Sequence, residues 1–162
     1  MLAWIGGLVF LTYLFQQFID DRYNPNTELA MVAGPDCVRE VVLLRNAQGN
    51  YVASGWINAE PVTFLLDTGA TDVAIPQSLA DRLGLPRLRR GMSRTANGTV
   101  PVWGTRLDTA QLGAVVLRDV RATIVPSMER GSPVLLGMSF LKQLEMVQRE
   151  GHLTLRQGAS RG

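Results

Sequence analysis

Short apolar runs separated by turn residues fill the chain from Arg39 to its end. The runs REVVLL and YVASGWIN flank the turn sequence RNAQGN, with Gly49 in the turn, and this pattern predicts a β-hairpin. After the turn NAEP, the run VTFLL is typical of a buried strand and ends at Asp67. DVAI predicts another short strand, and PQSLADRLGL predicts a helix with Pro76 in its first turn and Gly84 at its end.

The second half of the chain continues this pattern of strands and turns. Asn97 and Gly98 stand between two extended runs in SRTANGTVPVWGTRLD, which is a strong sequence signal for a hairpin. AVVLRDVRATIVP predicts one or two further strands, and PVLLGMSFLKQLEMV predicts a strand, a glycine and a short helix. EMVQREGHLTLR predicts a closing hairpin that turns at Glu150 and Gly151. Many short strands with two small helices predict a mainly β fold.

The first residues have a different pattern. LAWIGGLVFLTYLFQQFI, from Leu2 to Ile19, contains no charged residue, and as a helix it is about 27 Å long, enough to cross a bilayer. A signal peptide is the alternative, but no basic segment precedes the run and no clear cleavage motif follows it. We therefore expect a transmembrane anchor over residues 1–20. Residues 21–38 lack a sustained period, and we expect them to form a linker.

At 162 residues and a net charge of +2, the chain has room for one modest domain and carries little excess charge. Arg87, Arg89, Arg90 and Arg94 form a basic cluster, but they are few and no aromatic residues alternate with them. A nucleic-acid site usually needs a larger basic patch. We therefore interpret the cluster as a solvated loop and expect no nucleic-acid partner.

Cys37 is the only cysteine and His152 the only histidine. A Cys/His zinc site needs about four such ligands, so we expect no metal, and nothing in the sequence calls for another cofactor. A cysteine hydrolase that uses Cys37 and His152 is a formal alternative, and it predicts inhibition by thiol alkylation.

Asp67 begins the sequence Asp-Thr-Gly directly after the apolar residues FLL. Placing a carboxylate beside apolar side chains costs desolvation free energy, so polar groups nearby have to compensate. Thr68 offers a hydroxyl group, and Gly69 permits a tight turn that exposes backbone N–H groups to the carboxylate. These residues predict a carboxyl group held rigidly at the base of a cleft.

One such carboxyl group cannot readily hydrolyse a peptide bond, whereas two that share a proton can. The charged member draws a proton from water, and the neutral member donates its proton to the substrate carbonyl. Asp108 also precedes a threonine, but alanine replaces the glycine there and no apolar strand leads into it. The chain is too short for a second lobe of the same build. We therefore expect Asp67 of a second copy to complete the pair across the two-fold axis of a homodimer.

Three stretches, in the order FLLDTGATDVAIP, TANG and LLGMSFL, resemble the retropepsins, the single-lobe aspartic proteases of retroviruses. They are more similar still to the membrane-anchored retropepsin-like proteases of proteobacteria. The resemblance covers about Arg39 to Arg156 and implies a closed retropepsin-like barrel. It also implies that Asp67 is the catalytic aspartate. The active-site loop that follows would consist of Thr68, Gly69, Ala70 and Thr71.

The resemblance assigns further roles around this loop. Thr68 would make a hydrogen-bonded brace between the active-site loops of the two subunits. The hairpin at Ala96, Asn97 and Gly98 would be a flap that folds over bound peptide and excludes water. Leu136 and Gly137 would pack behind the catalytic loop.

The sequence departs from the retroviral pattern at Thr71 and Met138, where those enzymes usually carry a paired Asp and Arg that support the dimer. Both residues are uncharged here, so other contacts have to hold the dimer. Asp72 either faces the substrate or is a surface turn residue, and the sequence does not decide between these.

We therefore expect a homodimeric aspartic endopeptidase domain over residues 39–157, acting on extended peptide or protein substrates, with a disordered tail at residues 158–162. A catalytically silent dimerisation or peptide-binding module of the same fold is the alternative, although such a module has no need for a paired carboxylate. The resemblance implies a single-pass protein of the bacterial inner membrane, anchored through Leu2 to Ile19, with the catalytic domain on the periplasmic side.

Overall fold

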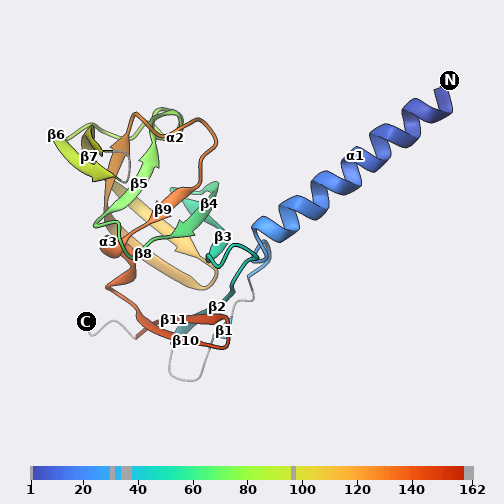
Figure 1. Ribbon diagram of the computed structural model, residues 1–162. Coiled ribbons are helices and arrows are strands. Elements are labelled where there is room, and N and C mark those ends of the chain that lie inside the picture. Colours follow the sequence, from blue (N-terminus) through green and yellow to red (C-terminus); the bar gives the residue numbers. More distant parts are fainter. Residues whose placement is uncertain (1, 30–31, 34–37, 96–97, 159–162) are drawn as a thin grey trace.

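The computed structural model describes residues 2–29, 32–33, 38–95 and 98–158. The helices in these ranges are α1 (Leu2–Tyr23), α2 (Gln77–Arg82) and α3 (Met138–Leu141). The strands are β1 (Val32–Ala33), β2 (Arg39–Leu44), β3 (Val52–Ile57), β4 (Glu60–Leu66), β5 (Val73–Pro76), β6 (Arg89–Thr95), β7 (Gly98–Leu112), β8 (Val115–Val125), β9 (Val134–Leu136), β10 (Glu145–Arg149) and β11 (His152–Gln157). The strands form two sheets, and α1 extends away from them (Figure 1).

The larger sheet curls into a closed barrel, as the resemblance implies. Its strand order is β3-β4-β9-β5-β8-β7-β6, and β3 also pairs with β7 through Trp56 opposite Gln111 and Ile57 opposite Ala110. This pairing closes the barrel and leaves β6 outside it as an edge strand. Gly55 allows the closure, because a Cβ atom at this position would lie only 2.4 Å from the carbonyl oxygen of Gln111.

The core lies inside the barrel, where the alternating apolar residues of the strands converge. The fully buried large side chains of the barrel strands are Ile57, Phe64, Ile75, Leu107, Leu112, Ile124 and Leu136. Phe140 and Leu141 of α3 are equally buried and belong to the same cluster. Burial of each such side chain contributes about 1.5–3 kcal/mol of transfer free energy. This packing fixes the ends of β4 and β9, from which the candidate site projects.

The second sheet has the strand order β1-β2-β11-β10 and lies below the barrel strands in Figure 1. Val41, Leu43, Leu153 and Leu155 alternate along β2 and β11 and are buried in the common core. The intervening residues face outward. There Arg156 donates a hydrogen bond to Glu40, and this bond raises the pKa of Arg156 above its ordinary value.

The prediction that REVVLL and YVASGWIN pair as a hairpin is wrong. The turn forms, because the side-chain oxygen of Asn46 accepts hydrogen bonds from the N–H groups of Gln48 and Asn50. However, β2 pairs with β1 and β11, whereas β3 pairs with β4 and β7. A turn sequence sets a local reversal of the chain, but the choice of strand partners depends on which apolar faces share a core. The hairpins β6–β7 and β10–β11 are confirmed, and β3 pairs with β4 across the turn that was predicted at NAEP.

Both short helices predicted from the sequence are present. α2 begins directly after Pro76, which is the last residue of β5 and precedes the helix instead of lying in its first turn. α3 follows Gly137 and places Ser139, Phe140 and Leu141 in buried positions. Each helix is only about a turn or two long, so tertiary packing and not intrinsic propensity stabilises it.

The N-terminal segment is helical over the length where an anchor is expected. Within the ranges that the structure describes, however, no helix has both the length and the apolar character needed to cross a membrane. The transmembrane anchor expected over residues 1–20 is therefore not supported. The last turns of α1 carry Gln16, Gln17, Asp20 and Arg22, which interrupt its apolar surface.

Part of the segment expected to be a linker, residues 21–38, packs against the domain instead. Asn26 is 3% exposed, and its side-chain amide donates hydrogen bonds to the carbonyl oxygens of Leu44 and Val52, at 2.9 and 2.7 Å. Its side-chain oxygen accepts a bond from the N–H of Leu44 at 2.7 Å. Because Leu44 belongs to the second sheet and Val52 to the barrel, Asn26 joins the two sheets. β1 also pairs with β2.

Candidate active site

Asp67 stands at the end of β4, where the barrel core stops. β4 runs parallel to β9, with Phe64 opposite Val134 and Leu66 opposite Leu136. Parallel strands end at the same edge of a sheet, so the residues that follow β4 and β9 come together there. The N–H of Asp67 donates to the carbonyl oxygen of Leu136 at 3.2 Å.

The loop after Asp67 is a tight turn that holds the carboxylate. Asp67 Oδ1 accepts a hydrogen bond from the N–H of Gly69 at 2.9 Å, and the carbonyl oxygen of Asp67 accepts one from the N–H of Ala70 at 3.2 Å. The Asp67 side chain is half-buried, and Thr68 and Gly69 are exposed. The carboxylate is therefore oriented by backbone groups and still open to solvent, as a group that must meet a substrate has to be.

Gly137 supports this loop from behind. A Cβ atom at Gly137 would lie 2.3 Å from the carbonyl oxygen of Asp72 and 2.7 Å from that of Ala70. Real Cβ contacts are never this short, so only glycine allows the loop to pack so closely. The N–H groups of Met138 and Ser139 then donate to the carbonyl oxygens of Ala70 and Thr71, at 2.8 and 2.9 Å.

These backbone bonds lie where the retroviral enzymes carry their Asp and Arg. The segments that contain Thr71 and Met138 are joined here by main-chain hydrogen bonds and not by a pair of charged side chains. Met138 is half-buried and packs against the core cluster. The uncharged residues at both positions are therefore compatible with a firmly held loop.

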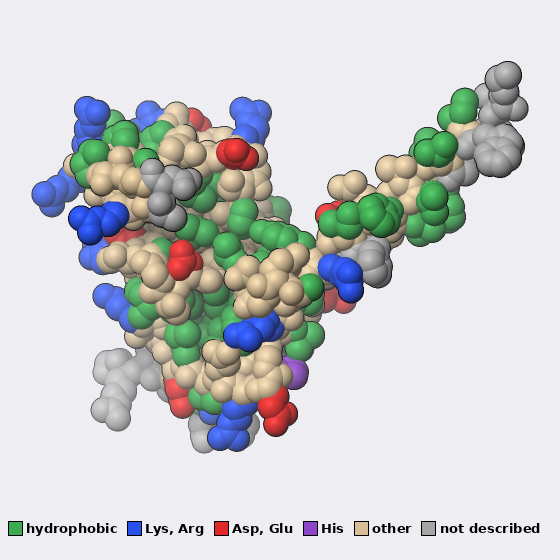
Figure 2. Space-filling model, viewed as in Figure 1, with side chains coloured by type: hydrophobic (Ala, Val, Ile, Leu, Met, Phe, Trp, Pro, Cys, Tyr) green, Lys and Arg blue, Asp and Glu red, His purple; other side chains and the backbone are tan. Residues whose placement is uncertain are grey.

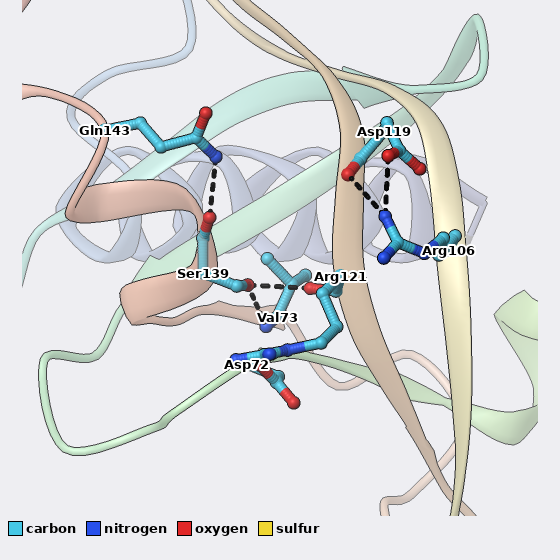
Figure 3. A network of polar contacts seen from close by, with 7 residues as sticks. All are labelled: Asp72, Val73, Arg106, Asp119, Arg121, Ser139 and Gln143. Carbon is cyan, nitrogen blue, oxygen red and sulfur yellow. Dashed lines mark hydrogen bonds and ion pairs between the residues drawn. The ribbon is translucent and has the colours of Figure 1, made fainter. Parts of the chain in front are cut away.

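Ser139 connects the loop to strand β8 (Figure 3). Its hydroxyl group accepts a hydrogen bond from the N–H of Val73 at 3.0 Å and donates one to the carbonyl oxygen of Arg121 at 2.7 Å. Ser139 is 5% exposed, so neither bond is readily replaced by water. Gln143 donates to the carbonyl oxygen of Ser139 and fixes the end of α3. The network joins β5, β8 and α3 directly behind the loop.

Asp72 is held by an ion pair. Arg121 donates from Nε to Asp72 Oδ1 at 2.7 Å, and the two residues lie beside the Ser139 network in Figure 3. The Asp72 side chain is 24% exposed and that of Arg121 is 56% exposed. Asp72 also lines the cleft described next.

A cleft of about 1180 Å³ opens above the loop. From the loop and the start of β5, it is lined by Asp67, Gly69, Ala70, Thr71, Asp72 and Ala74. It is also lined by the whole of β6 and by Val100, Val102 and Gly104 of β7. A cavity of this size accommodates several residues of an extended peptide. The cleft thus brings the Asp-Thr-Gly loop together with the hairpin expected to be a flap.

The structure places most of the expected site residues around this cleft. Leu136 and Gly137 lie directly behind the loop, as expected. Gly98 pairs with Thr95 as the first residue of β7, and it is Thr95 that lines the cleft. Ala96 and Asn97 lie outside the described residues.

Within the described ranges, the cleft contains two carboxylates. One is Asp67, and the other, Asp72, is bound to Arg121. Asp108 is exposed on β7 and does not line the cleft. The described part of one folded chain therefore offers a single unpaired aspartate in the cleft, whereas a carboxylate pair needs two. No three His, Cys, Asp or Glu side chains in the described parts of the chain come together as a metal-binding group.

Sequence reasoning missed three features of the site. The partner of Asp72, Arg121, is distant in the sequence, and no local pattern connects the two. Ser139 could have been noticed as a small polar residue in the first turn of an apolar helix, where a buried hydroxyl group usually has a partner. The arginines of β6 were seen as a cluster but read as a solvated loop, whereas they line the cleft.

The alternative cysteine chemistry receives no support from the described residues. Cys37 lies outside them. His152 is exposed in β11 of the second sheet, and its ring lies 3.1 Å from the carbonyl oxygen of Glu150. It does not line the cleft that contains Asp67.

A closed β-barrel with an Asp-Thr-Gly loop in its cleft defines the class of retropepsin-like aspartic proteases. The crystal structure of a retropepsin-like aspartic protease from Rickettsia conorii has the same fold, with a TM-score of 0.60 and 21% sequence identity. The match covers 80% of this chain and 94% of that one. Residues 53–143 match the family model described as "gag-polyprotein putative aspartyl protease", and the chain belongs to this family.

Two curated proteins are also similar. The chain is 31% identical over 122 residues to an uncharacterized protein in the cobV 5′ region of Sinorhizobium sp., a match that covers 73% of this chain and 52% of the relative. It is 25% identical over 111 residues to uncharacterized protein RP867 of Rickettsia prowazekii (strain Madrid E), a match that covers 67% of this chain and 47% of the relative. The chain thus spans about half the length of the curated relatives it matches.

Proposed function

We propose that this protein is an aspartic endopeptidase whose catalytic centre forms between two copies of the chain. The observation that carries the proposal is the Asp67 carboxylate, held by the N–H of Gly69 in a solvent-open cleft at the end of β4. Each chain supplies one such aspartate, so the second comes from an identical loop related by a two-fold axis. Thr68 is exposed beside Asp67, and in the proposed dimer it would brace the two loops.

The proposed chemistry needs only the two carboxyl groups and a water molecule. Two carboxyl groups about 3 Å apart cannot both ionise readily, so in the proposed centre they would share one proton. The ionised Asp67 takes a proton from the water while the water oxygen attacks the carbonyl carbon of the scissile bond. The protonated Asp67 donates its proton to the carbonyl oxygen. Collapse of this intermediate breaks the C–N bond, returns a proton to the nitrogen and releases an amine and a carboxylic acid.

The hairpin of β6 and β7 supports a role as a flap over the substrate. β6 is the edge strand of its sheet and lines the same cleft as Asp67. An extended peptide can therefore be held by hydrogen bonds along a strand while its scissile bond lies over the loop. Closure of such a hairpin also excludes bulk water from the reaction.

A comparison of aspartate variants tests the catalytic role. Asp67→Asn and Asp67→Ala should abolish cleavage of an unfolded protein substrate between about pH 4 and 7. The matched control is Asp108→Asn, which changes the exposed aspartate of the chain's other Asp-Thr pair and should cleave like the wild type. Equal cleavage by the Asp67 variants and the wild type would remove Asp67 as the catalyst. Retained peptide binding without cleavage in any protein, wild type included, would favour the silent binding module.

A mixing experiment tests the shared centre. If each active centre needs two intact Asp67 residues, an equal mixture of wild type and Asp67→Asn allowed to exchange subunits leaves about a quarter of the dimers active. Activity then falls to about half of what the wild-type chains give alone. Chains that work singly would keep their full activity in the mixture. Analytical ultracentrifugation of the same samples, with and without a peptide-like inhibitor, measures the dimer directly.

The cellular location stays a prediction. We expect the protein at the bacterial inner membrane with the barrel on the periplasmic side. The exposed apolar side chains of α1, among them Leu8, Phe10 and Phe15, support an attachment to lipid. Fractionation of cells that produce the full chain, with and without residues 1–20, tests the attachment. Recovery of both proteins in the same soluble fraction would contradict it.

A further inference from the structure

Strand β6 and the residues on either side of it carry a concentration of positive charge. Between Gly84 and Asp108 the chain has five arginines and no Asp, Glu or Lys. Two of these arginines have carboxylate partners, because Arg87 binds Asp81 and Arg106 binds Asp119. The other three, Arg89, Arg90 and Arg94, all belong to β6 and have no carboxylate partner among the described residues.

These three arginines line the cleft that contains Asp67. Arg89 lies opposite Gly104, on the side of the hairpin that continues into the cleft-lining Val102. Arg90 lies opposite Trp103, with its guanidinium carbon 5.9 Å from the ring centroid, and strand alternation places Arg94 on that same side. Both sides of the edge strand are therefore positively charged. Figure 2 shows basic side chains around the part of the molecule that contains β6 and β7.

The negative charge in the cleft does not balance these arginines. Of its two aspartates, Asp72 is paired with Arg121, and Asp67 remains. In the proposed centre one proton is shared by two Asp67 residues, which halves that charge per subunit. Charges within about 8–10 Å still interact at physiological salt, so a peptide lying along β6 experiences a net positive field.

We propose that this cleft selects peptide substrates with acidic side chains flanking the scissile bond, and that Arg89, Arg90 and Arg94 determine this preference. The inference rests on the proposed function, since it names the substrate class of the same cleft. A nucleic acid would also meet the charge, but the arginines line the same cleft as Asp67, and base-stacking aromatic side chains do not alternate with them. A peptide fits that position better.

The test uses three peptides that differ only at two positions on either side of the cleaved bond, with Glu, Gln or Lys there. The full-length wild type should cleave the Glu peptide with a kcat/KM at least about threefold above that of the Gln peptide, because exposed charge pairs contribute modestly. The Lys peptide should be the poorest. Raising the salt concentration from about 0.05 to 0.5 M should bring the three values together.

Variants then assign the preference to β6. The triple change Arg89→Gln, Arg90→Gln and Arg94→Gln should lower kcat/KM for the Glu peptide to the value for the Gln peptide. Arg118→Gln is the matched control, because Arg118 is exposed on β8 and does not line the cleft. It should keep the ratio between the two values. A preference unchanged in the triple variant, or absent in the wild type, overturns the proposal.

A binding experiment separates this proposal from the proposed function. Fluorescently labelled Glu and Gln peptides are titrated into the Asp67→Asn protein, which needs no catalysis to report affinity. Tighter binding of the Glu peptide that disappears when the three arginines are also replaced supports the charge preference. If the wild type at the same time cleaves none of the peptides, that result counts against the proposed protease activity and not against the charge preference. Equal binding of both peptides contradicts the preference. Stronger, arginine-dependent binding of a single-stranded oligonucleotide than of the Glu peptide would also contradict it.

Discussion

The backbone N–H of Asp67 donates a hydrogen bond to the carbonyl oxygen of Leu136, which lies in a strand distant in the sequence. Leu136 is fully buried in the barrel core, whereas Asp67 is open to the cleft. The bond therefore links the backbone of Asp67 to the buried core of the barrel. Close-packed interiors resist local deformation, so a loop tied to one is held in place.

We expect Gly137→Ala to destabilise the protein by about 1–3 kcal/mol or more, because the new methyl group has no room between two backbone carbonyl groups. Urea denaturation should show a lower midpoint with an unchanged m-value. Gly91→Ala is the control, since its Cβ atom would lie 3.8 Å from the nearest atom, in Val102. Equal midpoints for the two variants would show that the loop does not pack against Gly137 as described.

Ser139→Ala should lower the free energy of unfolding by about 2–4 kcal/mol. The change leaves the buried N–H of Val73 and the carbonyl group of Arg121 without a partner, and each such group costs about 1–3 kcal/mol. Ser78→Ala, on the half-buried surface of α2, should change stability by less than about 0.5 kcal/mol. A loss no larger for Ser139→Ala than for Ser78→Ala would argue against the network.

The Asp72–Arg121 pair should contribute little to overall stability despite its short distance. Arg121 is more than half exposed, and exposed pairs are worth about 0.2–1 kcal/mol. A double-mutant cycle with Asp72→Asn and Arg121→Gln should give a coupling free energy in this range that decreases with salt. The pair of Arg106 and Asp119, whose aspartate is 73% exposed, is the comparison and should give a smaller value. A larger coupling free energy for the more exposed pair would show that burial does not set the strength of these pairs.

Asn26→Ala and Asn26→Asp should both destabilise the domain by about 2–5 kcal/mol. Alanine removes three hydrogen bonds between the sheets, and aspartate places an oxygen where an NH₂ group now faces the carbonyl oxygens of Leu44 and Val52. Thermal unfolding of these variants is compared with that of Gln48→Ala, which alters an exposed turn residue. Unfolding of Asn26→Ala at the same temperature as Gln48→Ala would show that residues before β2 are a free linker after all.

Much of the site follows from local sequence. Asp67, Thr68 and Gly69 after an apolar run predict a turn that presents a carboxylate. This prediction depends on a few neighbouring residues and on conformational rules that act within a turn. The place of Gly137 behind that turn was expected only from the resemblance to the retropepsins. The partners of Asn26, Ser139 and Arg121 could not be predicted in this way, because each of these residues binds a residue far away in the chain.

The sequence by itself determined most of the strands, the short helices, two of the hairpins and the position of Asp67 at a strand end. These features depend on side-chain period and turn chemistry, which a short segment carries in full. Only the tertiary structure decided that β2 and β3 part into different sheets, that Arg121 holds Asp72, and that the arginines of β6 border the cleft. Such contacts join distant segments, and they are selected by which faces can be buried together once the barrel closes.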